Sequence, residues 1–238
     1  QKEGLKYLKK SAELKDKLGM LIYAQILNNS GNVNNMKEAR KYYKILIDQN
    51  NPEAMLDYGC MYFNGTGVSV NMEKSYKYFK MAADLGNSEA MSYVGQCLYF
   101  GFGTQIDKNE SIRYLKKSIE LDSNKGRLIY AGILRKNNDD ESNKEAIKYL
   151  KTIIDAGDSL INKNGVQIMK KGKTDIEIFA ESMALYGEML YYGIGIESNK
   201  KESIKYLKKA VEFNDSYGIV VYAKTLLENE DMESKIKA

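Results

Sequence analysis

The sequence has no histidine and no tryptophan, a single proline, Pro52, and only two cysteines among its 238 residues. Without histidine, the chain lacks the commonest general base and the side chain that most often binds metals. Two cysteines are too few to complete a cysteine-based zinc site. We therefore expect no catalytic residues, no metal site and no cofactor, and we expect that the chain is not an enzyme.

Long apolar segments and rigid turns are also scarce. No apolar run approaches the roughly 20 residues that a membrane-spanning helix needs. The near absence of proline favours long helices. The composition, 43% hydrophobic and 29% charged, is ordinary for a globular protein, and the net charge is only +4. We therefore expect a helical globular chain without a membrane span.

One short pattern with a small residue in an apolar stretch recurs along the chain, as in "LDYGCMY" and "LIYAGIL". A fixed period of this kind indicates an array of one structural unit. The small residues are separated by 35, 36, 36, 56 and 36 positions, and they are Ala24, Gly59, Gly95, Ala131, Gly187 and Ala223.

A second pattern alternates with the first and places a tyrosine between lysines, as in "ESIRYLKKSIEL". Apolar residues in both patterns recur at close to 3.6 positions, so both predict helices, which we name helix A and helix B. The distance from the tyrosine to the next small residue is 17 positions, except between Tyr149 and Gly187, where it is 38. The tyrosines are Tyr7, Tyr42, Tyr78, Tyr114, Tyr149 and Tyr206.

These patterns predict a lone helix B, five A–B pairs and a lone helix A. A single pair cannot bury its apolar face, so neighbouring pairs must stack. We expect an all-α, right-handed α-solenoid of antiparallel helix pairs, about 36 residues per repeat, as a single domain of about six repeats over 1–238. The ragged ends predict a longer solenoid and end-to-end contact through uncapped repeats.

A glycine-containing turn links helix A to helix B in "NGTGVSVNMEKS". A dinucleotide-binding loop would follow a strand, carry a third glycine and open directly into a helix, and this turn does none of these. We expect Gly65 to end helix A in the left-handed conformation and Gly67 to let the chain turn back. The same turn recurs at 99–107 and 191–199.

The segment "EAMLDYGCMYFNGTGVSVNMEKSYKYFKMAADLGNSEAM" closely resembles the Sel-1-like repeat, a tetratricopeptide-like helical hairpin. The resemblance is strong over 54–122 and 180–213 and weaker over 18–49 and 125–157. It implies a curved superhelix used for protein–protein contact, with helix A on the concave face. Members of this family include adaptors of endoplasmic-reticulum quality control, signalling scaffolds, regulators of wall synthesis and modules attached to kinases.

The function expected from these features is that of a non-catalytic scaffold or adaptor that binds a peptide or protein on its concave face. Two alternatives stay open: a regulatory repeat segment of a larger enzyme such as a protein kinase, and a component of endoplasmic-reticulum quality control. We expect no binding of nucleic acid, because lysines and acidic residues alternate along helix B and largely cancel each other's field. Variable positions on helix A supply the candidate partner-binding residues Phe63, Gln96, Tyr99, Arg135, Glu188 and Tyr191.

An insertion of 21 residues, at 158–178, explains the one long spacing. It is either a solvated loop or a docking element whose candidate binding residues are Ile168, Met169 and Lys170. Because the 17-residue register resumes after it, we expect the stack to need nothing from this segment. Cys60 and Cys97 are not equivalent in the repeat, so we expect free thiols and a cytoplasmic location. A secretory or endoplasmic-reticulum location is the alternative.

Overall fold

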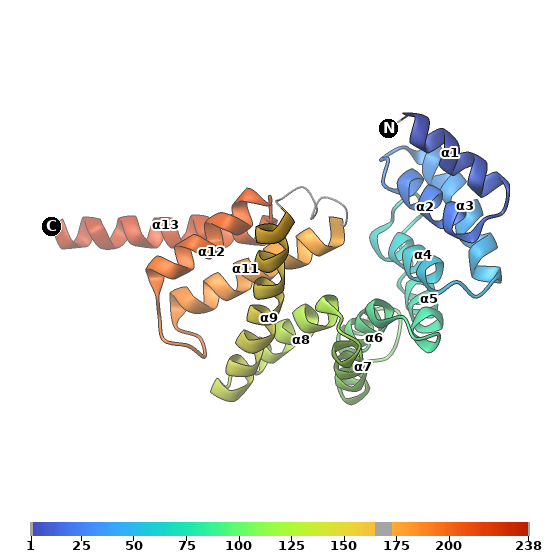
Figure 1. The fold of residues 1–238 in the computed structure, drawn as a ribbon. Helices are drawn as coiled ribbons and strands as arrows, with labels where there is room; N and C mark the ends of the chain where they lie inside the picture. Colours follow the sequence, from blue (N-terminus) through green and yellow to red (C-terminus); the bar gives the residue numbers. More distant parts are fainter. Residues whose placement is uncertain (1, 165–172, 238) are drawn as a thin grey trace. The chain divides into compact units, whose positions relative to one another are not determined.

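The computed structural model describes residues 2–164 and 173–237, and within them it contains twelve helices and no strand (Figure 1). The all-α prediction is confirmed. The helices are α1 (Lys2–Glu13), α2 (Lys17–Asn28), α3 (Val33–Asp48), α4 (Pro52–Asn64), α5 (Met72–Asp84), α6 (Ser88–Phe100), α7 (Lys108–Glu120), α8 (Asn124–Asn137), α9 (Asp140–Asn164), α11 (Lys173–Tyr192), α12 (Lys200–Glu212) and α13 (Ser216–Lys237).

The chain forms two compact units, 1–126 and 127–238, and the boundary between them lies within α8. Unit 1 contains the helix B α1 and the pairs α2–α3, α4–α5 and α6–α7. Unit 2 contains most of α8, followed by α9, the pair α11–α12 and the helix A α13. This order agrees with the predicted lone helix B, five pairs and lone helix A. That all of 1–238 forms a single array stays a prediction.

Helix A begins at a polar N-cap in five of the six repeats. In each, a side-chain oxygen accepts a hydrogen bond from the backbone N–H three residues later, at 2.6–3.2 Å. Such a cap satisfies a donor that the first helical turn leaves unpaired, and it stabilises the helix by about 1 kcal/mol. The capping residues are Asp16, Asn51, Asn87, Ser123 and Asp215.

The two helices of a pair cross closely at the small residue of helix A. In α6 and α7, the Ser111 hydroxyl donates to the carbonyl oxygen of Gly95 at 2.6 Å. Leu115, one turn later and fully buried, packs on the same glycine, where an added Cβ would lie 2.6 Å from Leu115 Cγ. The same arrangement of serine, glycine and large apolar residue recurs as Ser75, Gly59 and Phe79 in α4–α5 and as Ser203, Gly187 and Leu207 in α11–α12.

The predicted tyrosines of helix B lie beside this crossing rather than at its centre. Most of them pack against a tyrosine that precedes the small residue of helix A. The tyrosines of helix B in these pairs are partly buried and those of helix A are buried, so the helix B rings shield the crossing from solvent while the next residue along helix B fills the core. The ring centroids are 5.5 Å apart for Tyr23 and Tyr42, 4.9 Å for Tyr58 and Tyr78, 5.6 Å for Tyr130 and Tyr149, and 4.9 Å for Tyr186 and Tyr206.

The glycine turns have the conformation expected from the sequence. Gly65 caps α4 with φ +72°, and Gly67 follows with φ +66°. The second glycine of each turn also packs on the helix B of the preceding repeat: a Cβ on Gly103 would lie 2.0 Å from the carbonyl oxygen of Met72. Close approach to a helix, and not to a phosphate, therefore accounts for this glycine.

The insertion differs from the expected loop, because its described flanks are helical. Residues 158–164 continue α9, and residues 173–178 form the start of α11. Ile178 is buried, and Asp158 lies 3.1 Å from Lys209 Nζ on α12. The expectation that the stack needs nothing from 158–178 is therefore wrong for Ile178, since its deletion removes a core side chain from unit 2. The candidates Ile168, Met169 and Lys170 lie outside the described residues.

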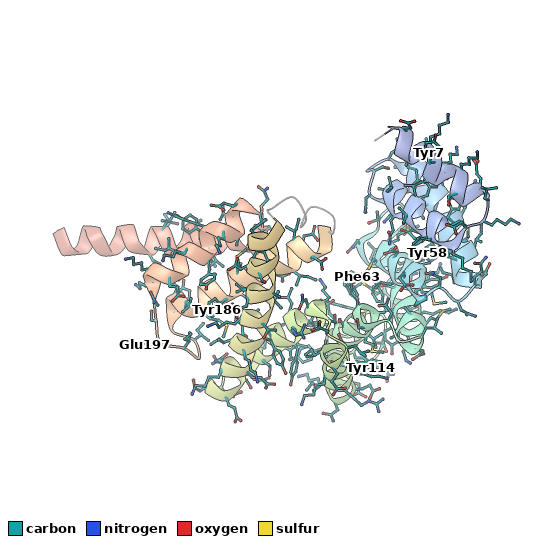
Figure 2. All side chains as sticks on the ribbon, in the orientation of Figure 1. Tyr7, Tyr58, Phe63, Tyr114, Tyr186 and Glu197 are labelled. Carbon is teal, nitrogen blue, oxygen red and sulfur yellow. The ribbon has the colours of Figure 1, made fainter. Side chains whose placement is uncertain are left out.

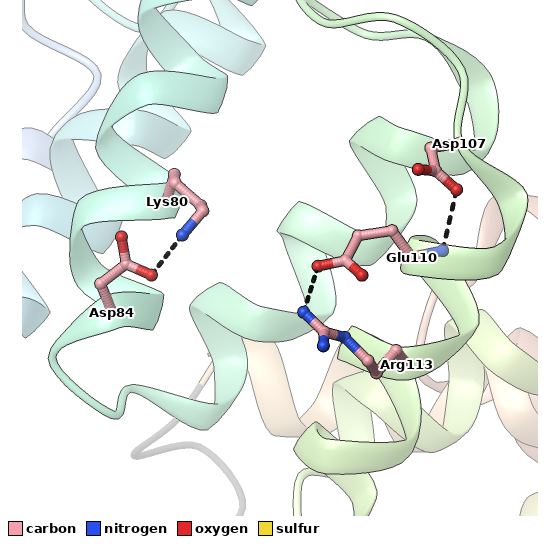
Figure 3. Close-up of polar contacts among 5 residues, drawn as sticks. All are labelled: Lys80, Asp84, Asp107, Glu110 and Arg113. Atoms are coloured by element: carbon pink, nitrogen blue, oxygen red, sulfur yellow. Dashed lines mark hydrogen bonds and ion pairs between the residues drawn. The ribbon is translucent and has the colours of Figure 1, made fainter.

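The charged side of helix B is solvated, as the sequence predicted. The lysines and arginine that precede the tyrosines are all exposed. Intrahelical ion pairs join Arg113 to Glu110, with 2.6 Å between Nη2 and Oε1, and Lys80 to Asp84 (Figure 3). Exposed pairs of this kind contribute about 0.2–0.5 kcal/mol each. This side therefore carries neighbouring charges of both signs.

The close crossing gives a test that uses two glycines of unit 2. We expect Gly187→Ala to lower the free energy of unfolding by about 1–3 kcal/mol, because the new Cβ would lie 2.9 Å from Leu207 Cγ. Gly132→Ala in α8 is the control: an added Cβ there meets nothing within 4 Å, so we expect a gain of up to about 1 kcal/mol. Urea unfolding measures both. Equal effects of the two substitutions would contradict the crossing argument.

Candidate interaction surface

One side of α4 in unit 1 carries polar, thiol and aromatic side chains in succession. Asp57, Cys60 and Phe63 follow one another at intervals of three residues, so they lie along one side of the helix (Figure 2 labels Phe63). The neighbouring helices A contribute contacts: Gln25 Nε2 of α2 donates to Asp57 Oδ2 at 3.0 Å, and the Tyr93 ring of α6 lies 6.3 Å from the Phe63 ring. We name Asp57, Cys60, Phe63, Tyr93, Phe100 and Phe102 the α4 track.

The aromatic part of the α4 track runs from the core of unit 1 to its surface. The ring of Phe63 lies 6.1 Å from that of Phe79, which is fully buried, and 5.9 Å from that of Phe102. Phe102 stacks on Phe100 at 5.4 Å, and Phe100 is 36% exposed. A surface aromatic that is continuous with packed rings is held in place before a partner arrives, which lowers the entropy lost on binding.

Asp57 at the other end of the track is a partly buried carboxylate. Burial raises its pKa, hydrogen bonding from Gln25 and Tyr43 lowers it, and the charge of Glu53 raises it again. Among the described residues, the charge that shifts the pKa of Asp57 is that of Glu53, which is negative. A carboxylate in such a place loses hydration without the compensation of a positive partner.

The two cysteines of unit 1 are free thiols. Burial, with the charges of Asp57 and Glu89, raises the pKa of Cys60 to about 12, and burial raises that of Cys97 to about 12. A nucleophilic cysteine needs a depressed pKa, because the thiolate is the reactive form. Both thiols are therefore protonated and unreactive near neutral pH.

In unit 2, two of the predicted binding residues bind each other. Arg135 of α8 forms an ion pair with Glu188 of α11, and both side chains are 20% exposed. The Tyr217 hydroxyl of α13 donates to Glu188 Oε2 at 2.7 Å. These contacts connect three successive helices A. Arg135 and Glu188 therefore hold neighbouring repeats together.

The other predicted residues differ in exposure. Phe63, Tyr99 and Gln96 are partly exposed in unit 1, and the Tyr99 ring lies 4.9 Å from Phe100 and 5.5 Å from Lys108 Nζ. Tyr191, also predicted to bind a partner, is buried in the structure. Its side chain is 3% exposed and its hydroxyl donates to the carbonyl oxygen of Thr225, because α13 covers it.

Sequence reasoning missed Asp57, Phe100 and Phe102. A signal for Asp57 was present: two positions before the small residue of helix A, the other five repeats have Ile22, Tyr93, Ile129, Leu185 and Val221. A single carboxylate at an apolar position departs from what packing alone requires. Phe100 and Phe102 flank the glycine that ends α6, and no periodicity marks such positions.

Other kinds of site have no support in the described residues. No group of three or more His, Cys, Asp or Glu side chains within 2–164 and 173–237 is placed to hold a metal ion. Among the described helices, none has the length and apolar character to cross a membrane. The described hollows are on helix B surfaces, one of about 210 Å³ beside Arg113, Tyr114 and Lys117 and one of about 440 Å³ along α12.

Comparison with known proteins identifies the repeat. The Sel1 repeat profile matches residues 1–16, 23–51, 52–87, 88–123 and 180–212. No curated protein sequence matches the chain significantly.

Two solved structures share the fold. One is a protective antigen present in uropathogenic Escherichia coli strains, described as displaying an SLR fold (TM-score 0.58, 18% identity, 94% of this chain and 52% of the antigen). The other is a Sel1 repeat protein from Oxalobacter formigenes (TM-score 0.58, 17% identity, 88% of this chain and 81% of that one). The present chain thus spans about half the length of the antigen.

The electrostatics of Asp57 predict a pH-dependent effect of Asp57→Asn. Because the pKa of Asp57 is raised in the folded state, the protonated carboxyl favours folding. This contribution to stability is complete below the unfolded-state pKa and is lost as pH rises through the folded-state pKa. We expect the variant to be more stable than the wild type at pH 7, with the difference shrinking as pH falls toward 4. Urea unfolding at both pH values checks this.

Glu120→Gln, at an exposed carboxylate of unit 1, is the control and should change stability little at either pH. If Asp57→Asn destabilises unit 1 equally at both pH values, the ionised carboxylate stabilises the fold and the argument from burial is wrong.

Proposed function

Because the chain belongs to the Sel1 repeat family, we propose that it is a non-catalytic scaffold that holds a protein partner on the helix A side of unit 1. Proteins of this family generally act as scaffolds for protein interaction. The proposal adds a place, the α4 track, and a type of partner, a peptide segment of another protein.

The observation that carries the proposal is the continuity of the aromatic rings from Phe79 in the core to Phe100 at the surface. Large aromatic side chains dominate the binding free energy of protein interfaces, above all when the surrounding structure holds them rigidly. Phe63 and Tyr99, two residues expected from the sequence to bind a partner, contact this series of rings. The unreactive thiols of Cys60 and Cys97 favour binding over catalysis.

The proposal also includes, in less detail, the cellular location of the chain and the kind of protein to which it belongs. Free Cys60 and Cys97 favour a reducing compartment, so we place the chain in the cytoplasm. The alternatives of a kinase regulatory segment and of endoplasmic-reticulum quality control both require a scaffold of this kind. No contact in the described residues favours either over a free-standing adaptor.

A second contact, between copies of the chain, is favoured by α13. Ile219, Leu226 and Leu227 are 45%, 40% and 64% exposed. They lie four positions before, three after and four after the small residue Ala223. In α4, the residues at the same positions relative to Gly59 contact helix B. The matching helix B pattern is exposed on α1, where Tyr7 is 63% exposed. We propose that α13 of one copy packs on α1 of a second.

The scaffold proposal is tested by Phe100→Ser. We expect this substitution to reduce capture of the natural partner by about tenfold or more, since truncating an interface aromatic commonly costs over 1 kcal/mol, while the lost contacts with Tyr99 and Phe102 lower the melting temperature by only a few degrees. Leu85→Ser is the matched control, because Leu85 is 48% exposed but lies at the end of α5, outside the track. Quantitative affinity capture from cell extract measures both. Equal retention by wild type and Phe100→Ser would place the interface elsewhere.

The contact between copies is tested by Leu227→Glu. A charge in the centre of the α13 face should convert any dimer or longer assembly of the wild type to monomer, because burying an unpaired carboxylate is costly. Leu121→Glu, at a 50% exposed leucine beyond α7, should leave the assembly unchanged. Sedimentation velocity over a range of concentrations decides. A wild-type chain that is monomeric throughout refutes this contact.

A further inference from the structure

We infer that Arg40, Tyr62 and Lys74 form a receptor for a phosphate monoester, carried as a phosphorylated side chain by a protein partner. The three residues belong to α3, α4 and α5 of unit 1, and none of them is part of the α4 track. The inference therefore goes beyond the proposed function. Three observations carry it: departures from the repeat pattern, the packing that brings the three side chains together, and an arginine without a partner.

Each of the three residues departs from the residue type at the equivalent position of the other five repeats. Tyr62 stands three positions after the small residue of helix A, where the others have leucine. Lys74 stands four positions before the tyrosine of helix B, where the others have glutamate, and Arg40 stands two before it, where the others are apolar or aromatic. The common residues are Leu27, Leu98, Leu134, Leu190 and Leu226 at the first position, Glu3, Glu38, Glu110, Glu145 and Glu202 at the second, and Leu5, Tyr76, Ile112, Ile147 and Ile204 at the third. The repeat fold is therefore built without these three side chains elsewhere in the chain.

The antiparallel packing of α3 on α4 turns Arg40 toward the C-terminal part of α4. Met36 packs on the turn that follows α4, since a Cβ added to Gly67 would lie 2.6 Å from Met36 Cβ. Further along α3, the Tyr43 ring lies 6.4 Å from the ring of Tyr58 on α4 (Figure 2 labels Tyr58). Arg40 lies between Met36 and Tyr43 on the same side of α3, because positions three and four apart share a helix face. It therefore faces α4 between Tyr58 and Gly67.

Lys74 reaches the same stretch of α4 from α5. Its Nζ atom lies 5.3 Å from the centroid of the Tyr62 ring. Tyr62 also packs edge-on against Tyr58, at 5.2 Å, and stacks on Tyr78 of α5, at 6.0 Å, so its ring is held in place before a ligand arrives. The Tyr58 hydroxyl donates to the Tyr62 hydroxyl, which leaves the Tyr62 proton for an acceptor outside the fold. Arg40 and Lys74 thus approach a phenol donor from two neighbouring helices.

Arg40 has no counterion within the fold. Its Nε atom is buried without a hydrogen-bond partner, and within residues 2–164 and 173–237 its guanidinium takes part in no ion pair. Glu38, the acidic residue nearest in sequence, is turned to the preceding repeat, where it accepts a hydrogen bond from the Tyr23 hydroxyl at 3.4 Å. Asp48 lies about 12 Å further along the axis of α3. A buried donor without a partner costs free energy, and a ligand that accepts from it recovers this cost.

The charges and donors fit a phosphate monoester better than a carboxylate. Lys74 replaces the glutamate of the other repeats, so two positive charges, with that of Arg40, face Tyr62. A phosphorylated side chain carries about −1.5 to −2 charges at pH 7 and three acceptor oxygens, whereas a carboxylate carries a single charge. A guanidinium binds phosphate through two parallel hydrogen bonds. A phosphate between the two cations accepts from both and from the Tyr62 hydroxyl.

The test uses the peptide N-acetyl-Gly-phosphoserine-Gly-amide and the same peptide with serine or glutamate at its centre. Amide chemical shifts of the isotopically labelled full chain are recorded during titration of each peptide, and of inorganic phosphate alone, to about 10 mM at constant ionic strength. We expect the phosphoserine peptide to shift the amides around Arg40, Tyr62 and Lys74 and to bind at least about tenfold more tightly than the serine and glutamate peptides.

Each other outcome of the titrations contradicts a stated part of the inference. Equal binding of the phosphoserine and serine peptides, or shifts that avoid α3, α4 and α5, overturns the site. Equal binding of the glutamate peptide overturns the assignment to phosphate. Inorganic phosphate that binds as tightly as the phosphoserine peptide overturns the assignment to a protein partner, because the ligand is then a free phosphate.

Lys74→Glu and Arg40→Ile are the matched variants. Each restores a residue that other repeats carry, so the fold should persist, and the urea unfolding curve checks this. Each should weaken binding of the phosphoserine peptide by about tenfold or more. Lys116→Glu makes the same charge change at an exposed lysine of α7 and should leave the affinity within about twofold, because salt screens distant charges. Equal losses in Lys74→Glu and Lys116→Glu overturn the inference, since net charge alone then attracts the phosphate. The scaffold proposal is judged separately, by Phe100→Ser.

Discussion

The close crossing of helix A and helix B at a glycine governs the rest of the structure. A buried serine hydroxyl donates to the glycine carbonyl, and a large apolar side chain one turn later fills the space that a Cβ would occupy. Because the two helices lie so close together, their tyrosines pack in pairs beside the crossing. The close crossing also fixes which residues of helix A face outward. The α4 track exists because Gly59 holds α4 close to α5, so that Phe63 packs on Phe79 of α5 while Asp57 is left to contact Gln25 of α2.

The track combines two kinds of contact that differ in their physical basis. The rings of Phe63, Phe100 and Phe102 are supported by the core, so they offer apolar area at low entropic cost. Asp57 is a partly buried carboxylate whose Oδ2 accepts a hydrogen bond from Gln25 of α2, so it joins α4 to the neighbouring helix A. The aromatic end of the track offers apolar area to a partner, and the carboxylate end holds the repeats together.

The fold could be predicted from the sequence because spacing is a direct record of repeated geometry. Small residues such as Gly95 and Ala24 mark helix crossings, and both are buried where expected. Surface roles were harder, since one sequence position does not reveal what a neighbouring repeat places beside it. Arg135 and Glu188 were both predicted to contact a partner, and the fold joins them to each other. Tyr191 lies beneath α13, a relation between repeats that the pattern of a single repeat does not contain. In the sequence, Asp57 could be detected only because the equivalent positions of the other five repeats carry apolar or aromatic residues.

The second glycine of each turn has a consequence for how such chains change length. Gly103 touches the backbone of Met72, and Gly195 approaches Asn143 in the same way, so the turn between helix A and helix B is wedged against the repeat before it. In the connection from helix B to helix A between α5 and α6, an added Cβ on Gly86 meets nothing within 4 Å, and at the equivalent connection between α9 and α11 the helices have lengthened. Whole repeats are therefore easier to insert or remove, by recombination or by protein engineering, at the connection from helix B to helix A. The glycine turn from helix A to helix B tolerates such changes poorly, because it packs on the preceding repeat. The natural cassette of this array begins at the N-cap of helix A and ends with the last residue of helix B.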